Sequence, residues 1–207
     1  FAREATRILL GAGRSPGRAP NPAELDHVAV KAPMFSFRRL AGADPVVGIE
    51  MASTGEVACF GNDGDEALLL AMLATGFRVP RKGALLSLGP VGDKYRFADE
   101  ARQLQALGLT LYATAGTADI LRAEGIAAEA LDKDGVGGRR DAVDVLRSGA
   151  IDLVINVPRT YDDRGVPDGY RIRRAAVDLE ISLITDLWLA RRVVQALART
   201  TVAALPV

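Results

Sequence analysis

The chain has 207 residues, enough for one large domain or two small ones. Its 26 basic and 26 acidic residues balance, which disfavours broad electrostatic binding to nucleic acid or to an anionic membrane. One cysteine and one histidine exclude an internal disulfide framework, a Cys/His zinc site and, unless His27 is its base, a Ser-His-Asp triad.

The first 80 residues predict a small α+β unit. The expected elements are a helix at 1–10, a loop at 11–22, strands at 27–31 and 34–37, a turn and strand at 53–60, and a helix from a cap at Asn62 or Asp63 to Gly76. Because the first residue is not Met and the helical pattern starts at once, we interpret the chain as a piece of a longer protein.

Residues 80–83, Pro-Arg-Lys-Gly, predict a domain boundary, and the pattern changes after them. Short apolar runs predict strands at 84–88, 110–113, 127–131, 153–157 and 182–185. Amphipathic runs predict helices at 94–107, 116–124, 141–148, 170–179 and 186–199. Strands that alternate with helices indicate an α/β fold, a five-stranded parallel sheet with helices on both faces.

Four polar residues follow the ends of two of these strands: Ser87, Lys94, Thr114 and Thr117. Ligands of open parallel sheets bind where strands end and helices begin. Helix N-termini add free N–H groups and partial positive charge, which suit a phosphate or a carboxylate. We therefore expect the four side chains to converge on one anion.

Three segments resemble the carbamoyl phosphate synthetase large chain: Lys-Ala-Pro-Met-Phe-Ser at 31–36, Asp-Pro at 44–45, and Glu-Met-Ala-Ser-Thr-Gly-Glu-Val-Ala-Cys-Phe-Gly at 50–61. They are similar to the tail of its second ATP-grasp unit, which makes carbamoyl phosphate from carbamate and ATP. Residues 83–199 resemble the regulatory domain that follows, with a methylglyoxal-synthase-like fold. The resemblance implies two units, at 1–80 and 83–207.

The resemblance also implies what the chain binds and what it lacks. The parent is an ATP-dependent ligase that uses ATP and Mg²⁺, and its ATP-site residues lie upstream, so this piece should be catalytically silent and need no cofactor. Expected partners are the rest of the large chain and a glutaminase subunit, and self-assembly into a homo-oligomer is left open. In the family, residues matching Ser87, Lys94, Thr114, Gly116 and Thr117 hold the effector phosphate. Residues matching Lys133 and Asn156 reach the rest of the ligand.

Two features bear on the effector. The spacing from Ser87 to Lys94 is one residue longer than in enteric bacterial relatives, and Val-Pro-Arg-Thr at 157–160 replaces a Thr-rich turn. Gly-Tyr-Arg-Ile-Arg-Arg at 169–174 and Ile-Thr-Asp at 184–186 resemble the multifunctional pyrimidine-pathway enzyme, which responds to uridine nucleotides and phosphoribosyl pyrophosphate. Gly169 stands where the form sensing N-acetylglutamate has an Asn. The spacing and the replaced turn are departures from the family, whereas the resemblance at 169–174 and 184–186 and the glycine at 169 favour a phosphorylated effector, a uridine nucleotide.

Alternative interpretations remain for the chain and for single residues. A lyase like methylglyoxal synthase would need an acid after Gly137-Gly138, where this chain has Arg139-Arg140, with Asp141 nearby and Asp168 as a second candidate. An assembly module would bind no ligand. Thr114 and Thr117 could simply cap a helix, and Lys133 could be solvated. Arg173 and Arg174 are typical of a solvated face or of salt bridges, or one could face an anion.

Overall fold

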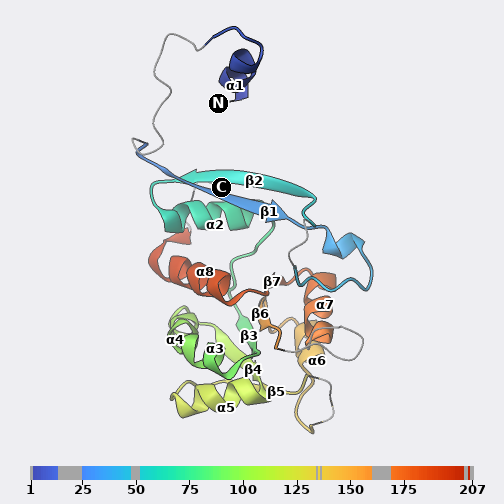
Figure 1. Cartoon of the computed structure of the whole chain (residues 1–207). Helices are drawn as coiled ribbons and strands as arrows, with labels where there is room; N and C mark the ends of the chain where they lie inside the picture. Colours follow the sequence, from blue (N-terminus) through green and yellow to red (C-terminus); the bar gives the residue numbers. More distant parts are fainter. Residues whose placement is uncertain are drawn as a thin grey trace.

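The computed structural model describes residues 2–13, 25–47, 52–133, 135, 137–159, 169–202 and 205. The loop expected at 11–22 lies mostly outside these residues, and Asp168 lies outside them as well. Figure 1 shows a two-stranded ribbon packed on helix α2 (Gly64–Ala74), then helix α8 (Leu187–Arg199), then a larger sheet. In the part of the chain that the structure describes, no helix combines the length and apolar character needed to cross a bilayer.

The N-terminal elements agree with the sequence except near residue 34. They are α1 (Ala2–Leu9), β1 (Val28–Met34), the 3-10 helix η2 (Phe37–Arg39), β2 (Gly55–Gly61) and α2. Strands β1 and β2 pair antiparallel, and the second strand expected at 34–37 is wrong because Met34 ends β1 and η2 follows. The cap of α2 is Asp63, whose carboxylate accepts from the backbone N–H groups of Asp65 and Glu66.

The predicted α/β fold is confirmed. Five parallel strands run in the order β5-β4-β3-β6-β7. Their bounds are Gly83–Leu88 (β3), Thr110–Thr114 (β4), Glu129–Leu131 (β5), Leu153–Val157 (β6) and Ser182–Ile184 (β7). All six residues of the central strand β3 are buried, as expected for a strand covered on both faces.

Helices cover both faces of the sheet. They are α3 (Val91–Arg96), α4 (Ala98–Ala106), α5 (Ala115–Ala123), α6 (Ala142–Arg147), α7 (Tyr170–Asp178) and α8. Successive residues of a strand point to opposite faces. Accordingly, Leu86 of β3 packs in a core with Leu121 of α5 and Val193 of α8, whereas Leu85 packs in a second core with Ile172 of α7.

The single helix expected at 94–107 is two helices, α3 and α4, which meet at Phe97. Phe97 ends α3 and starts α4, and its side chain is 0% exposed. The ring belongs to the core that also holds Leu104 of α4 and Val193 of α8. Lys94 consequently lies in the last turn of α3 and not, as expected, at the start of a helix.

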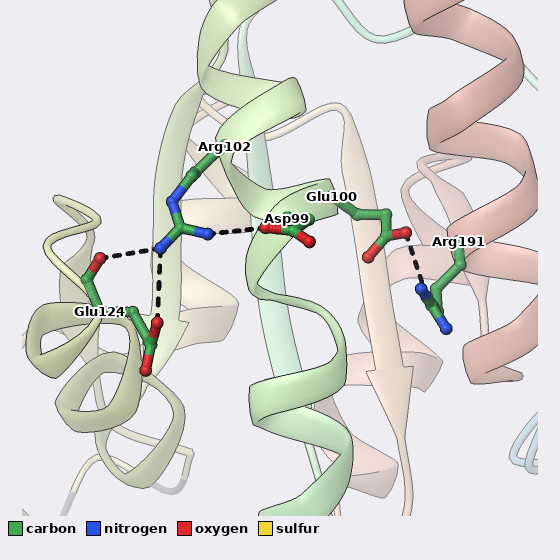
Figure 2. A network of polar contacts seen from close by, with 5 residues as sticks. All are labelled: Asp99, Glu100, Arg102, Glu124 and Arg191. Atoms are coloured by element: carbon green, nitrogen blue, oxygen red, sulfur yellow. Dashed lines mark hydrogen bonds and ion pairs between the residues drawn. The ribbon is translucent and has the colours of Figure 1, made fainter.

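Ion pairs hold α4 between its neighbours (Figure 2). Arg102 donates to the carboxylate of Asp99 at 2.8 Å and to the carbonyl oxygen of Glu124, at the end of α5, at 3.1 Å. On the other side of α4, the buried Glu100 accepts from Nε of Arg191, on α8, at 3.1 Å.

The segments on either side of the expected boundary at 80–83 pack tightly against each other. Leu69 of α2 and Phe77 belong to the same buried core as the sheet and α8. Arg192 of α8 contacts Asp65 at 2.6 Å. The carboxylate of Asp152, just before β6, accepts from the backbone N–H groups of residues 81–83 at 2.7–3.2 Å. The division into units at 1–80 and 83–207 stays a prediction.

Candidate functional site

Three of the predicted site residues share one face at the carboxyl edge of the sheet. Ser87 of β3 lies opposite Asn156 of β6 in the parallel register, and Leu86 lies opposite Ala113, one residue before Thr114. The two-residue period of a strand places all three side chains on the face that carries the α6 and α7 core. They are 3%, 1% and 4% exposed respectively, so this edge buries polar groups.

Thr117 connects the first turn of α5 to the end of β3 by hydrogen bonds. Its Oγ1 accepts from the backbone N–H of Leu88 at 3.2 Å and lies 3.4 Å from the carbonyl oxygen of Leu88. The hydroxyl of Thr114 donates to the same Oγ1 at 3.4 Å. Thr114 occupies the N-cap position of α5, but its side chain makes no capping bond. The hydroxyls therefore form a buried pair between two strand ends rather than a helix cap.

The side chain of Lys94 reaches the same helix start. Its residue is only 9% exposed, and a Cβ placed on Gly116 would lie 3.1 Å from Nζ. Gly116 is therefore the residue type that lets the ammonium approach the backbone of α5. The ammonium and the positive end of the helix dipole have the same sign, and an anion between them would stabilise both.

Lys133 lies at the same edge of the sheet but farther from its centre. Lys133 lies two residues after the end of the edge strand β5, which pairs with β4. Its side chain is half-buried. Its carbonyl oxygen accepts from Arg171 of α7 at 3.4 Å. The structure thus gathers Ser87, Lys94, Thr114, Gly116, Thr117 and Asn156 near the ends of β3, β4 and β6 and leaves Lys133 at the rim.

Arg173, one of two arginines that the sequence allowed to face an anion, contacts the predicted site residue Asn156. Its side chain is 0% exposed, and its Nη1 donates to Oδ1 of Asn156 at 2.7 Å. Its Nε and Nη2 donate to the carboxylate of Asp44 at 2.8 and 2.5 Å. The expectation of a solvated face is wrong for Arg173, whereas the expectation of a salt bridge is confirmed. The sequence quoted Asp44 only within a motif of the family resemblance and did not predict this pairing.

The carboxylates near this edge have structural roles. Asp141 caps α6 by accepting from the backbone N–H of Val143 at 2.8 Å and also contacts Arg171 at 3.6 Å. Asp132 is buried and accepts from the backbone N–H of Arg139 at 2.8 Å. The described residues contain no group of three or more His, Cys, Asp or Glu that could hold a metal ion.

Two hollows lie elsewhere. A cavity of about 560 Å³ opens at the opposite end of β4, lined by Thr110, Leu111 and Arg122 among others. Another of about 360 Å³ lies between β1, α2 and α8, beside Trp188. We assign the candidate site from the converging polar side chains rather than from cavity size, because neither hollow is lined by a lysine or by more than one hydroxyl-bearing side chain.

Comparisons with known proteins agree with the fold. Residues 96–185 match the MGS-like domain family. The chain is 42% identical over 204 residues, 94% of its length, to the multifunctional protein URA2 of Saccharomyces cerevisiae, of which the match covers 9%. It is 45% identical over 184 residues to the multifunctional protein CAD of Squalus acanthias, covering 82% of this chain and 8% of the relative. The mitochondrial ammonia carbamoyl-phosphate synthase of Mus musculus is 39% identical over 208 residues, and the match covers 97% of this chain and 14% of the relative.

The five-stranded sheet and the family match together define an MGS-like α/β domain. Beyond this domain, the chain is similar over most of its length to these multifunctional proteins and carbamoyl-phosphate synthases, which is consistent with the C-terminal region of a carbamoyl phosphate synthetase large chain. The chain spans about a tenth of the length of these curated relatives.

Proposed function

We propose that the MGS-like domain binds a phosphorylated effector and thereby regulates carbamoyl phosphate synthesis by the larger protein. The observation that carries this proposal is the Lys94 ammonium at the first turn of α5, beside the buried hydroxyls of Thr114 and Thr117. A regulator acts by binding two conformations of its protein unequally, so the effector must prefer one state of the parent.

The donor chemistry favours a phosphate over a carboxylate. Ser87, Thr114 and Thr117 offer rotatable hydroxyls, Lys94 offers a point charge, and they come from two strand ends and two helices. A tetrahedral anion can accept donors from several directions, whereas a planar carboxylate is matched best by the fork of an arginine. Arg173, which contacts the predicted site side chain Asn156, holds Asp44 with its fork.

A uridine nucleotide is the effector we favour. Support comes from the resemblance at 169–174 and 184–186 and from the space beside Asn156. A Cβ placed on Gly169 would lie 2.7 Å from Nδ2 of Asn156, so a side chain there would press on the amide. Gly169 also has a φ of 80°, a conformation that glycine adopts readily.

For the parent, we propose the activity that the family implies: ATP-dependent synthesis of carbamoyl phosphate from bicarbonate and glutamine or ammonia, with Mg²⁺, in the cytoplasm. The remainder of the large chain and a glutaminase subunit would be its partners. In this proposal the 207-residue chain senses the effector and carries no catalytic residue of its own.

Titration calorimetry and a thermal-shift screen test the proposal. The ligands are UMP, UTP, IMP, phosphoribosyl pyrophosphate, ornithine and N-acetylglutamate. We expect a uridine nucleotide to bind and inorganic phosphate or sulfate to compete with it. Tight binding of N-acetylglutamate without binding of UMP, UTP or phosphoribosyl pyrophosphate would contradict a phosphorylated effector, and binding of none would favour an assembly module.

Two lysine variants locate the site. Lys94→Ala should weaken binding about ten- to a hundredfold, because it removes a charged donor worth roughly 1.5–3 kcal/mol. Lys82→Ala is the matched control, since Lys82 precedes the opposite end of β3 and its Nζ donates to the carbonyl oxygen of Gly149 at 3.0 Å. Equal affinity in Lys94→Ala and Lys82→Ala would move the site elsewhere. Formation of methylglyoxal from dihydroxyacetone phosphate would instead support the lyase.

A further inference from the structure

Helix α7 joins the candidate site to the segment between β1 and β2. Figure 1 shows α7 beside the short helical turn that follows β1. The hydroxyl of Tyr170 donates to the carbonyl oxygen of Gly42 at 2.7 Å. Nη1 of Arg174 lies 3.0–3.1 Å from three carbonyl oxygens, those of Phe37, Leu40 and Ala43. The first turns of α7 therefore hold residues 37–43 by their backbone.

Arg173 makes the same connection through side chains alone. Its fork binds the Asp44 carboxylate through Nε and Nη2, and its third nitrogen, Nη1, binds Asn156. A fully buried guanidinium is stable only while its charge and donors are matched, so its position is fixed by both partners. A shift of either partner changes the geometry offered to the other.

The amide nitrogen Nδ2 of Asn156 has no acceptor among the described residues. A guanidinium has only donors, so the group of Asn156 that faces Arg173 must be the oxygen, and Nδ2 must point the other way. Nδ2 is buried and makes no hydrogen bond among the described residues. A buried donor without an acceptor is costly. Because Gly169 has no side chain, an acceptor from outside the protein can approach this amide.

The opposite end of the connection reaches the backbone. Oδ1 of Asp44, which accepts from Arg173, also accepts from the backbone N–H of Val46 at 3.1 Å. The intervening Pro45 restricts the chain between the two residues. One continuous set of hydrogen bonds thus runs from the amide of Asn156 through Arg173 and Asp44 to the segment at 44–47.

We infer that Arg173 is a positioning residue that transmits effector occupancy from Asn156 to residues 37–47. This inference rests on the proposed function, because it needs an effector at the site. An acceptor oxygen of the effector, a carbonyl or phosphate oxygen, binds Nδ2 of Asn156 and fixes the amide. The fixed amide holds Arg173, and Arg173 holds Asp44, so residues 37–47 open less often. Hydrogen bonds in such a chain strengthen one another.

Hydrogen exchange followed by mass spectrometry tests the connection on the 207-residue chain. Saturating UTP should slow exchange of the amides in 37–47 about fivefold or more, the lower end of typical coupling between sites. The amides of Leu40, Ala43 and Val46 are hydrogen-bonded and report opening of the segment. Binding of UTP to the wild-type chain without slower exchange in 37–47 would overturn the connection and leave the proposed effector binding intact.

Arg173→Lys tests the residue itself. A lysine keeps the charge, but one ammonium cannot reproduce a fork that reaches both Asp44 and Asn156. Because Arg173 also orients the amide of Asn156, we expect a weaker Kd for UTP and, at UTP concentrations that still saturate the variant, loss of the slowed exchange. Should the variant lose its cooperative thermal transition, Asp44→Asn tests the same connection from its other end.

Arg191→Lys is the matched control. Arg191 also pairs with a buried carboxylate, that of Glu100, but on α8 and away from the site (Figure 2). It should keep both UTP binding and the exchange response. A response that persists in Arg173→Lys, or that disappears equally in Arg191→Lys, would contradict a specific role of Arg173. Failure of UTP to bind the wild-type chain would overturn the uridine effector and this inference together.

Discussion

Gly116→Ala should raise stability and lower anion affinity at the same time. Gly116 lies inside α5, and no positive φ is recorded for it, so alanine fits the helix backbone. Replacing glycine by alanine inside a helix stabilises by about 0.5–1 kcal/mol. The new Cβ would lie 3.1 Å from Nζ of Lys94, closer than ordinary contact, so the ammonium must move by a few tenths of an ångström.

The movement of the Lys94 ammonium determines how much anion affinity is lost. Losing a hydrogen bond to a charged group costs roughly 1.5–3 kcal/mol, and a shifted ammonium should lose about the lower figure, near tenfold in affinity. Urea unfolding measures the stability, and calorimetry with UTP and with inorganic phosphate measures the affinity. Gly92→Ala is the matched control, because Gly92 lies in α3 and a Cβ there meets nothing within 4 Å.

Gly92→Ala should give a comparable gain in stability without a loss of affinity. If Gly116→Ala binds phosphate as tightly as Gly92→Ala does, then Lys94 and the first turn of α5 do not share an anion, and the reasoning about this site is refuted.

Three further predictions concern the scaffold and the chemistry. Thr117→Val should lower the free energy of unfolding by about 1–3 kcal/mol, because the buried N–H of Leu88 loses its acceptor; an unchanged urea midpoint would contradict this. Phe97→Ala should lower it by about 3–5 kcal/mol by emptying a fully buried ring position, as the same measurement checks, and a loss below about 1 kcal/mol would mean that the ring is not packed. The 207-residue chain should hydrolyse ATP no faster than a heat-killed control in a phosphate-release assay, and clear turnover would show that it holds an ATP site.

The structure changes what replacement of Thr117 would measure. From the sequence, Thr117 lies at a helix start, away from the core, and its replacement should weaken effector binding alone. In the structure Thr117 is 0% exposed and holds the end of β3 through Leu88. Its replacement therefore mixes binding with stability, whereas Gly116→Ala separates the two.

Local pattern was enough for the sheet and for most helix limits. Apolar runs such as 84–88 and 153–157 predicted buried parallel strands, since only a strand covered on both faces is apolar throughout. Because parallel strands end at the same edge of a sheet, these predicted strands also placed Ser87 and Asn156 side by side at the carboxyl edge. The capping chemistry of Asp63 likewise depends on its immediate neighbours.

Contacts between distant residues could be decided only by the tertiary structure. The sequence predicted one helix through Phe97, since the break there depends on the core that receives the ring. The pairing of Arg173 with Asp44 joins residues 129 positions apart, and no local period encodes such a distance. The sequence by itself determined which residues could hold an anion. Packing decided that Lys94 reaches Gly116 and that Arg173 links Asn156 to Asp44, because burial leaves each charge only those partners that the fold brings within reach.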